Sequence, residues 1–105
     1  MNSIFKISEV AIKQLKQIRE EQNIGEEYLL RIGVRTSSAC GGVSYVIGFD
    51  TQEDADKVFN VNDIPVLVEK RHMMFLAGLT VDYVDEENRT GFTFITPQTK
   101  KNAKT

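Results

Sequence analysis

Apolar residues alternate with other residues in two stretches, 28–34 and 43–49, on either side of a run of small side chains. A period of two is typical of half-buried β-strands, so the pattern predicts a strand in each stretch. Residues 36–42 between them offer almost no apolar side chain to a core, and Gly41-Gly42 can adopt a positive φ. The sequence therefore predicts a flexible, solvent-accessible loop at 36–42, joining two strands.

The N-terminal stretch has a helical period instead. Apolar residues recur there on one side of a helix whose other side is largely polar: Ala11, Leu15 and Ile18. Ser8 can accept hydrogen bonds from the free N–H groups of a first turn, and Ile7 and Ile12 can pack across that cap. We predict an amphipathic helix over 8–23 that Gly25 brings to an end.

The second half of the chain predicts short elements joined by tight connections. Asn62-Asp63 reads as a turn, and Gly78 as the end of a short helix. The remaining predicted elements are strands at 57–60, 64–69, 79–84 and 90–95 and the short helix at 71–76. One leading helix packed on several short strands makes this an α+β protein with mixed or antiparallel sheets. We expect one domain over 1–105, with 98–105 as a flexible tail.

The composition of the chain argues against nucleic acid and membranes as partners. The chain has 105 residues, 41% of them hydrophobic, and a formal net charge of −2 with both signs interspersed. This balance gives no electrostatic footprint for nucleic acid. No apolar run approaches the roughly 20 residues that span a bilayer, and no signal peptide opens the chain, so we expect no membrane partner. A single cysteine excludes an internal disulfide, so a cytoplasmic location is expected.

Two sets of residues could bind a metal ion or carry out catalysis, but each also has a simpler structural interpretation. A run of carboxylates suggests a hard-cation site, but it lacks EF-hand spacing and a turn glycine, which favours a solvated connection: Asp50, Glu53, Asp54 and Asp56. Cys40 could act as a nucleophile only beside a base, and His72 is the one imidazole. Nothing in the sequence orients His72 towards Cys40, so we interpret His72 as a partly buried or surface histidine and the chain as no enzyme.

Four segments together resemble one known family. Gly33-Val34-Arg35-Thr36-Ser37, followed by Cys40 and then Gly and Tyr, is similar to the signature loop of the A-type iron–sulfur carriers, the HesB/IscA-like family. Three further segments resemble that family in the same order along the chain: 7–11 at its first helix, Phe75 to Val84, and Gly91 to Pro97. The resemblance covers nearly the whole chain.

The resemblance implies a compact HesB-like fold, with two small sheets and the helix packed on one side. It implies an iron–sulfur cluster carrier or scaffold that delivers clusters to apo-proteins. The cargo would be a 2Fe-2S or 4Fe-4S cluster, or iron, bound transiently through Cys40 as the cofactor and metal ligand. The implied partners are a second copy of the chain, in a homodimer or higher oligomer, together with iron–sulfur assembly proteins and recipient apo-proteins.

The chain departs from the family pattern in two places. The loop is one residue longer before Cys40, and the family's terminal Cys-Gly-Cys pair is absent. Its cysteines would fall near Ala103 and Thr105, so the chain is either Cys-poor by nature or stops before such a tail. One alternative is therefore a relative that acts as a protein-binding module without metal. Another is a thiol redox sensor, which needs a lowered pKa of Cys40 that only Arg35 is near enough in sequence to promote.

Overall fold

The computed structural model describes residues 4–37 and 42–97. The chain divides into two compact units, one formed by Met1–Ile24 with Gly78–Thr105 and the other by Gly25–Ala77. Cys40 and the predicted tail at 98–105 lie outside the described residues. Among the helices of the described part, none has the length and apolar character that a membrane crossing requires.

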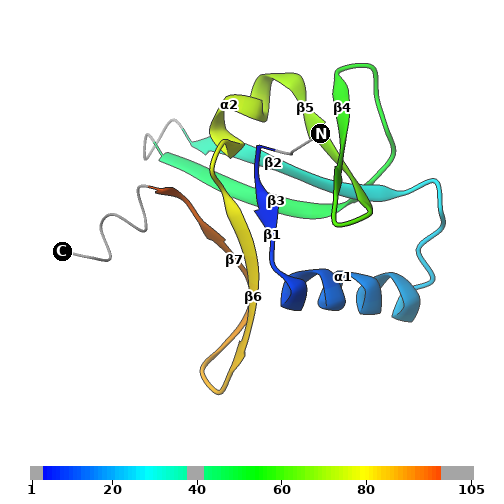
Figure 1. The fold of residues 1–105 in the computed structure, drawn as a ribbon, viewed down its shortest axis with the longest axis vertical. Coiled ribbons are helices and arrows are strands. Elements are labelled where there is room, and N and C mark those ends of the chain that lie inside the picture. Colours follow the sequence, from blue (N-terminus) through cyan, green and yellow to red (C-terminus); the bar gives the residue numbers. More distant parts are fainter. Residues whose placement is uncertain (1–3, 38–41, 98–105) are drawn as a thin grey trace. The chain divides into compact units, whose positions relative to one another are not determined.

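The first unit is a small sheet with one helix. Its elements are β1 (Lys6–Ile7), α1 (Glu9–Glu21), β6 (Thr80–Glu86) and β7 (Arg89–Ile95), with strand order β1-β6-β7 (Figure 1). β1 runs parallel to β6, and β7 runs antiparallel to it. Helix α1 packs against β6. The buried apolar side chains of this unit come from α1, from β1 and β6, and from the residues just before these two strands: Phe5, Ile7, Ala11, Ile12, Leu15, Leu79 and Val81.

Both ends of α1 have side-chain or backbone caps. Ser8 is the N-cap, as predicted, and its Oγ accepts a hydrogen bond from the N–H of Ala11 at 3.1 Å. At the other end, Asn23 adopts a φ of 51°, and the N–H of Ile24 donates to the carbonyl of Arg19 at 3.0 Å. This Schellman-type ending stops the helix two residues before the predicted end. The prediction that Gly25 ends the helix was therefore wrong.

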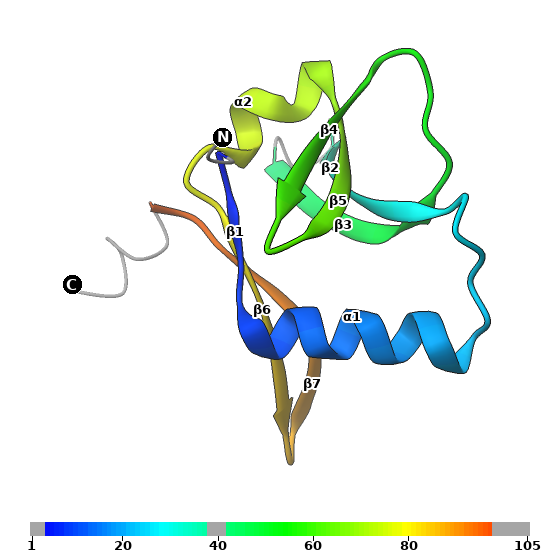
Figure 2. The same ribbon diagram turned by 45° about the vertical axis from the view of Figure 1, so that its right-hand side comes forward.

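The second unit is a mixed four-stranded sheet with a short helical segment. The strands are β2 (Leu29–Ser37), β3 (Gly42–Asp50), β4 (Asp56–Val61) and β5 (Ile64–Glu69), in the order β3-β2-β5-β4 (Figure 2). β2 is antiparallel to β3 and parallel to β5, which is antiparallel to β4. A 3₁₀ turn, η1 (Lys70–His72), and a short helix, α2 (Met73–Leu76), follow β5.

The burial pattern explains this strand order. In β2 the buried apolar side chains alternate, as expected of a strand with one face in the core: Leu30, Ile32 and Val34. Gly33, between two of them, is buried as well. In β5 three consecutive residues are buried, which is typical of a strand covered on both faces: Val66, Leu67 and Val68. Asn62 and Asp63 have φ values of 49° and 67° and close a two-residue hairpin between β4 and β5, where the sequence predicted a turn.

The α+β fold class is confirmed, with two small sheets and α1 as the leading helix. The four strands expected on either side of the cysteine loop and near the C-terminus are all present, and the short helix ends before Gly78, which has a φ of 80°. β1 was not predicted, because a two-residue strand is too short to show a period.

Candidate functional site

Strands β2 and β3 form a hairpin, and the segment that contains Cys40 lies between them in the sequence. The two strands stay in register from the pair Leu29–Asp50 to the pair Ser37–Gly42. The prediction of a loop over 36–42 was therefore wrong at its ends, since Thr36, Ser37 and Gly42 belong to the strands. Thr36 and Val43, which form one pair, are residue types that favour strands, and pairing outweighed the lack of apolar residues nearby. Only 38–41 separate the strand ends.

One end of β2 is held by a charged network around Arg31. The guanidinium of Arg31 donates to both carboxylate oxygens of Asp56, at 2.7 and 2.6 Å, and to Oδ2 of Asp50 at 2.9 Å. It also donates to the carbonyl of Thr51 at 3.2 Å. The Asp56 side chain is only 2% exposed, whereas that of Asp50 is 53% exposed. The paired contact with Asp56 is the geometry in which arginine and carboxylate bind most strongly.

This network changes the interpretation of the acidic segment. The hydrogen bond from Arg31 is the main cause that lowers the pKa of Asp56, and a hydrogen bond from the N–H of Glu53 at 2.8 Å adds to it. The same contact with Asp56 raises the pKa of Arg31. The prediction of a solvated connection was thus wrong for Asp56, which is buried because an arginine 25 residues earlier neutralises it. Among the described residues, no group of three or more His, Cys, Asp or Glu side chains is arranged to hold a metal ion.

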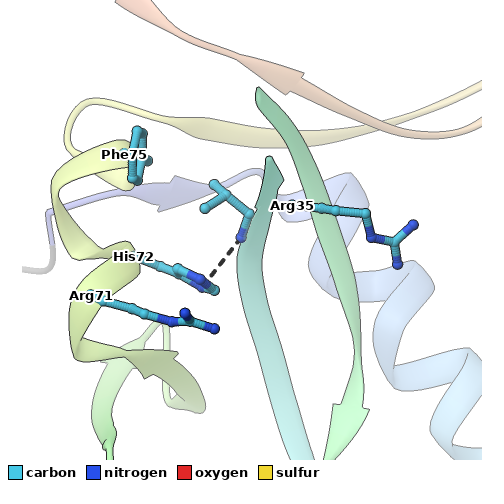
Figure 3. Close-up of a pocket in the computed structure, with 5 residues that line it drawn as sticks. Arg35, Arg71, His72 and Phe75 are labelled. Carbon is cyan, nitrogen blue, oxygen red and sulfur yellow. Dashed lines mark hydrogen bonds between the residues drawn. The ribbon is translucent and has the colours of Figure 1, made fainter. Parts of the chain in front are cut away.

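The other half of β2 faces the segment that follows β5. Nδ1 of His72 accepts a long hydrogen bond of 3.4 Å from the backbone N–H of Val34 (Figure 3). Nε2 of His72 lies 3.7 Å from Oε2 of Glu69, and the histidine side chain is 18% exposed. His72 is therefore partly buried, and both of its ring nitrogens face groups of the protein rather than a free site.

The imidazole lies directly over Gly33. A Cβ atom at this position would come within 2.9 Å of Nδ1 of His72, closer than side chains tolerate. Glycine is thus needed at 33 for the ring to approach the strand. In the sequence, the Gly33-Val34 dipeptide is the one local sign of this arrangement. It does not identify the partner, because His72 lies 38 residues beyond Val34.

An open pocket of about 360 Å³ surrounds this contact, lined by Val34, Arg35, Arg71, His72 and Phe75. In Figure 3 the side chain of Arg35 extends away from His72 and Arg71. Arg71 lies beside His72 and forms an ion pair with Glu69 at 2.8 Å, so its charge already has a partner. The alternative of a redox sensor, in which Arg35 would lower the pKa of Cys40, stays untested, since Cys40 is outside the described residues.

A second contact joins the same strand pair to α2. Tyr45 is paired with Val34 in the hairpin, and its hydroxyl donates to the carbonyl of Phe75 at 3.0 Å. The pair Val34–Tyr45 is therefore attached to the η1–α2 segment on both strands. Three further pairs continue the hairpin towards 38–41: Arg35–Ser44, Thr36–Val43 and Ser37–Gly42. The structure thus places a two-point attachment three pairs from the end of the hairpin.

Comparison with known proteins identifies the family. Residues 4–105 match the profile of a family described as iron-sulphur cluster biosynthesis. The chain belongs to this family. It is 39% identical over 80 residues to the iron-binding protein IscA of Enterobacter sp. (strain 638), a match that covers 75% of this chain and 74% of that protein. The resemblance recognised in the sequence is confirmed.

Solved structures of related proteins share the fold. A solution NMR structure of an Aquifex aeolicus protein is 35% identical, with a TM-score of 0.68, and the match covers 92% of this chain and 95% of that one. A crystal structure of IscA with the [2Fe-2S] cluster has a TM-score of 0.75 over 89% of this chain and 85% of that one, at 22% identity. These likenesses confirm the HesB-like fold that the motifs implied.

Proposed function

We propose that this iron–sulphur cluster biosynthesis protein carries an iron–sulfur cluster, or iron, as its cargo and passes it to recipient apo-proteins. The observation that carries the proposal is the position of the only cysteine. Cys40 lies in the four-residue connection, 38–41, between the paired strand ends Ser37 and Gly42, within a chain that matches the family over residues 4–105.

Thiolate chemistry suits this cargo. Iron–sulfur clusters are held by cysteine thiolates, usually four of them, and one chain supplies one. We therefore infer that two or more chains contribute Cys40 to each cluster, with any remaining positions filled by a Cys-containing tail beyond this sequence, by a small thiol or by another protein. Incomplete ligation of this kind suits transfer, because an incoming ligand can displace the weakest contact without breaking a closed four-cysteine site.

The described side chains give the cargo no obvious second ligand. Nδ1 of His72 accepts the hydrogen bond from the N–H of Val34, and Nε2 faces Glu69. A metal would have to displace one of these contacts to bind the ring. The other candidate, the pair Asp50 and Asp56, is neutralised by Arg31. These contacts support an assignment of the ligand role to Cys40.

Anaerobic reconstitution with iron and sulfide tests the proposal. The wild-type chain, Cys40→Ala and the neighbouring control Ser38→Ala would be compared by visible absorbance, by iron and sulfide per chain, and by light scattering. We expect the wild type and Ser38→Ala to bind iron and sulfide as a dimer or larger oligomer, whereas Cys40→Ala binds neither. Its free energy of unfolding should stay within about 0.5 kcal/mol of wild type, as for other surface substitutions.

Two results would count against the proposal. Uptake of iron by Cys40→Ala equal to that of the wild type would remove the ligand role of this cysteine. Failure of the wild type to take up iron or sulfide, with a monomeric mass throughout, would favour the alternative of a protein-binding relative without metal. That alternative rests on the single thiol, which falls short of the usual ligand number.

A further inference from the structure

The edge of β2 that faces β5 is paired with that strand over only part of its length. The parallel pairing of β2 with β5 is formed at Leu30–Val66 and Arg31–Leu67. Because the two strands run in the same direction, the chain that leaves β5 continues alongside the second half of β2. This brings η1 and α2, rather than another strand, beside Val34.

His72 occupies the place of a strand partner at this edge. Its Nδ1 accepts from the N–H of Val34, as the carbonyl of a neighbouring strand would. Gly33 leaves room for the ring, and Glu69 faces the opposite nitrogen. An uncharged imidazole held in this way offers an acceptor of fixed position.

The contact lies at the point where the hairpin is attached to η1–α2. The Val34–Tyr45 pair receives the His72 contact on β2 and the Tyr45–Phe75 contact on β3. Beyond it the hairpin continues for three pairs to Ser37–Gly42, and Cys40 follows in the next three residues of the sequence. The remaining pairs are the path by which a change in the direction of β2 at Val34 would reach the end of the hairpin.

We propose that His72 is a positioning residue, which sets through Val34 the direction of the hairpin end that carries Cys40 and thereby the stability of the bound cargo. The inference rests on the proposed function of Cys40. It assigns the role to the acceptor atom Nδ1 and gives His72 no contact with iron. The acceptor rather than the ring should therefore decide the outcome of substitution.

Two substitutions of nearly equal shape separate these possibilities. His72→Asn keeps an oxygen acceptor near the position of Nδ1, whereas His72→Leu removes the acceptor. Each reconstituted protein would be challenged with the iron chelator bathophenanthroline, and its bound cluster would be examined by visible circular dichroism. We expect His72→Leu to lose iron about fivefold faster than wild type, the factor that one ordinary hydrogen bond represents. His72→Asn should stay within about twofold of wild type.

The spectrum and the starting iron content complete this test. The visible circular dichroism of His72→Leu should differ from that of the wild type, although both begin with the same iron per chain. His72→Asn should restore the wild-type spectrum. Equal rates and spectra for all three proteins would overturn the positioning role and leave the carrier proposal intact, because the wild type still holds its cargo.

NMR on the protein without iron or sulfide provides a second test, which does not depend on reconstitution. By NMR, the amide resonances of both Val34 and Cys40 should shift in His72→Leu and return in His72→Asn. A shift at Val34 that is absent at Cys40 would show that the contact is structural only, and the positioning role would be rejected. Glu69→Gln is a further comparison, since it changes the group that faces Nε2 and Arg71 but keeps the acceptor Nδ1. Its Val34 and Cys40 resonances should stay closer to those of the wild type than the resonances of His72→Leu.

Discussion

The two halves of β2 are held in different ways. At Arg31 a guanidinium donates to both oxygens of a buried carboxylate at 2.7 and 2.6 Å and to a second carboxylate at 2.9 Å. At Val34 a single backbone N–H donates to a neutral imidazole at 3.4 Å. Ionised partners form hydrogen bonds about twice as strong as neutral ones, and the bond to His72 is long as well. Stability should therefore depend mainly on the Arg31 end.

This difference separates two tasks within one strand. The charged network joins β2 to β4, where Asp56 lies, and so fixes the sheet around which the second unit is built. The weak contact at Val34 lies nearer the segment with Cys40 and contributes direction rather than much free energy. A strand arranged in this way should keep its fold when only the contact at Val34 is lost.

The largest effect is expected at the charged end. Asp56→Asn keeps the size of the side chain but leaves the guanidinium of Arg31, 19% exposed, without its buried carboxylate partner. We expect a loss of about 3 kcal/mol in the free energy of unfolding, the low end of the cost of breaking a buried ion pair. Urea unfolding measured at pH 7 checks this value.

The matched control is Asp50→Asn, which removes the other carboxylate on the same arginine. The Asp50 side chain is 53% exposed, so its removal should cost less than about 0.5 kcal/mol. Similar losses for the two variants would contradict the view that one buried carboxylate anchors this end of β2.

The second-largest effect is expected from acid, which should weaken the contact between Arg31 and Asp56. The folded state lowers the pKa of Asp56 below its ordinary value of 3.8, chiefly through the hydrogen bond from Arg31. The folded protein therefore binds fewer protons than the unfolded chain, and this stabilisation is present above that value and lost as the pH falls through the folded pKa. We expect the difference in unfolding free energy between wild type and Asp56→Asn to shrink as the pH is lowered below about 4.

The first unit supplies a comparison for this acid effect. The pKa of Asp82 is also lowered, mainly by the Ser8 hydroxyl, which donates to its Oδ1 at 2.6 Å. Asp56→Asn should keep this contribution, so its own stability should still fall in acid. A variant difference that stays constant between pH 5 and pH 3 would show that the Arg31 contact does not lower the pKa of Asp56.

The sequence predicted those features that depend on neighbours in the chain. The period-two patterns located β2, β3, β6 and β7, Ser8 identified the start of α1, and Asn62-Asp63 marked a turn, because each signal is local. One feature that it missed depends on a distant partner: Asp56 is buried only because Arg31, 25 residues away, pairs with it. The end of α1 is a local miss, because Asn23 adopts the positive φ that was expected of Gly25.

At the candidate site, too, the sequence predicted the local motif but not the long-range contact. Cys40 was found from the motif around it, by resemblance to a family, and not from any spacing that requires a metal. The role of His72 could not be read from the sequence, because the ring reaches Val34 only after β5 has paired in parallel with β2. Long-range pairing of this kind leaves no periodic trace in either segment.

The smallest effect on the unfolding free energy is expected at Gly33. A substitution there tests the contact between His72 and β2 in the protein without cargo. Gly33→Ala places a methyl group 2.9 Å from Nδ1 of His72, so the ring or the strand must move. We expect a loss of about 1 kcal/mol in unfolding free energy, as for other cases of overpacking. In the His72→Ala background the next neighbour of that methyl group is Cγ2 of Val46 at 3.8 Å, an ordinary contact.

A double-mutant cycle over Gly33→Ala and His72→Ala therefore isolates the contact between the ring and the strand. Without the ring, alanine at 33 should be neutral or stabilising by a few tenths of a kcal/mol, because glycine weakens a strand interior through its greater freedom when unfolded. The coupling free energy should then be about 1 kcal/mol. Equal costs of Gly33→Ala in both backgrounds would mean that the imidazole does not lie over the strand in solution. The Val34–Tyr45 pair would then be attached to η1–α2 through the hydroxyl of Tyr45 on β3 and no longer through His72. The contrast between the two halves of β2 would need a different explanation.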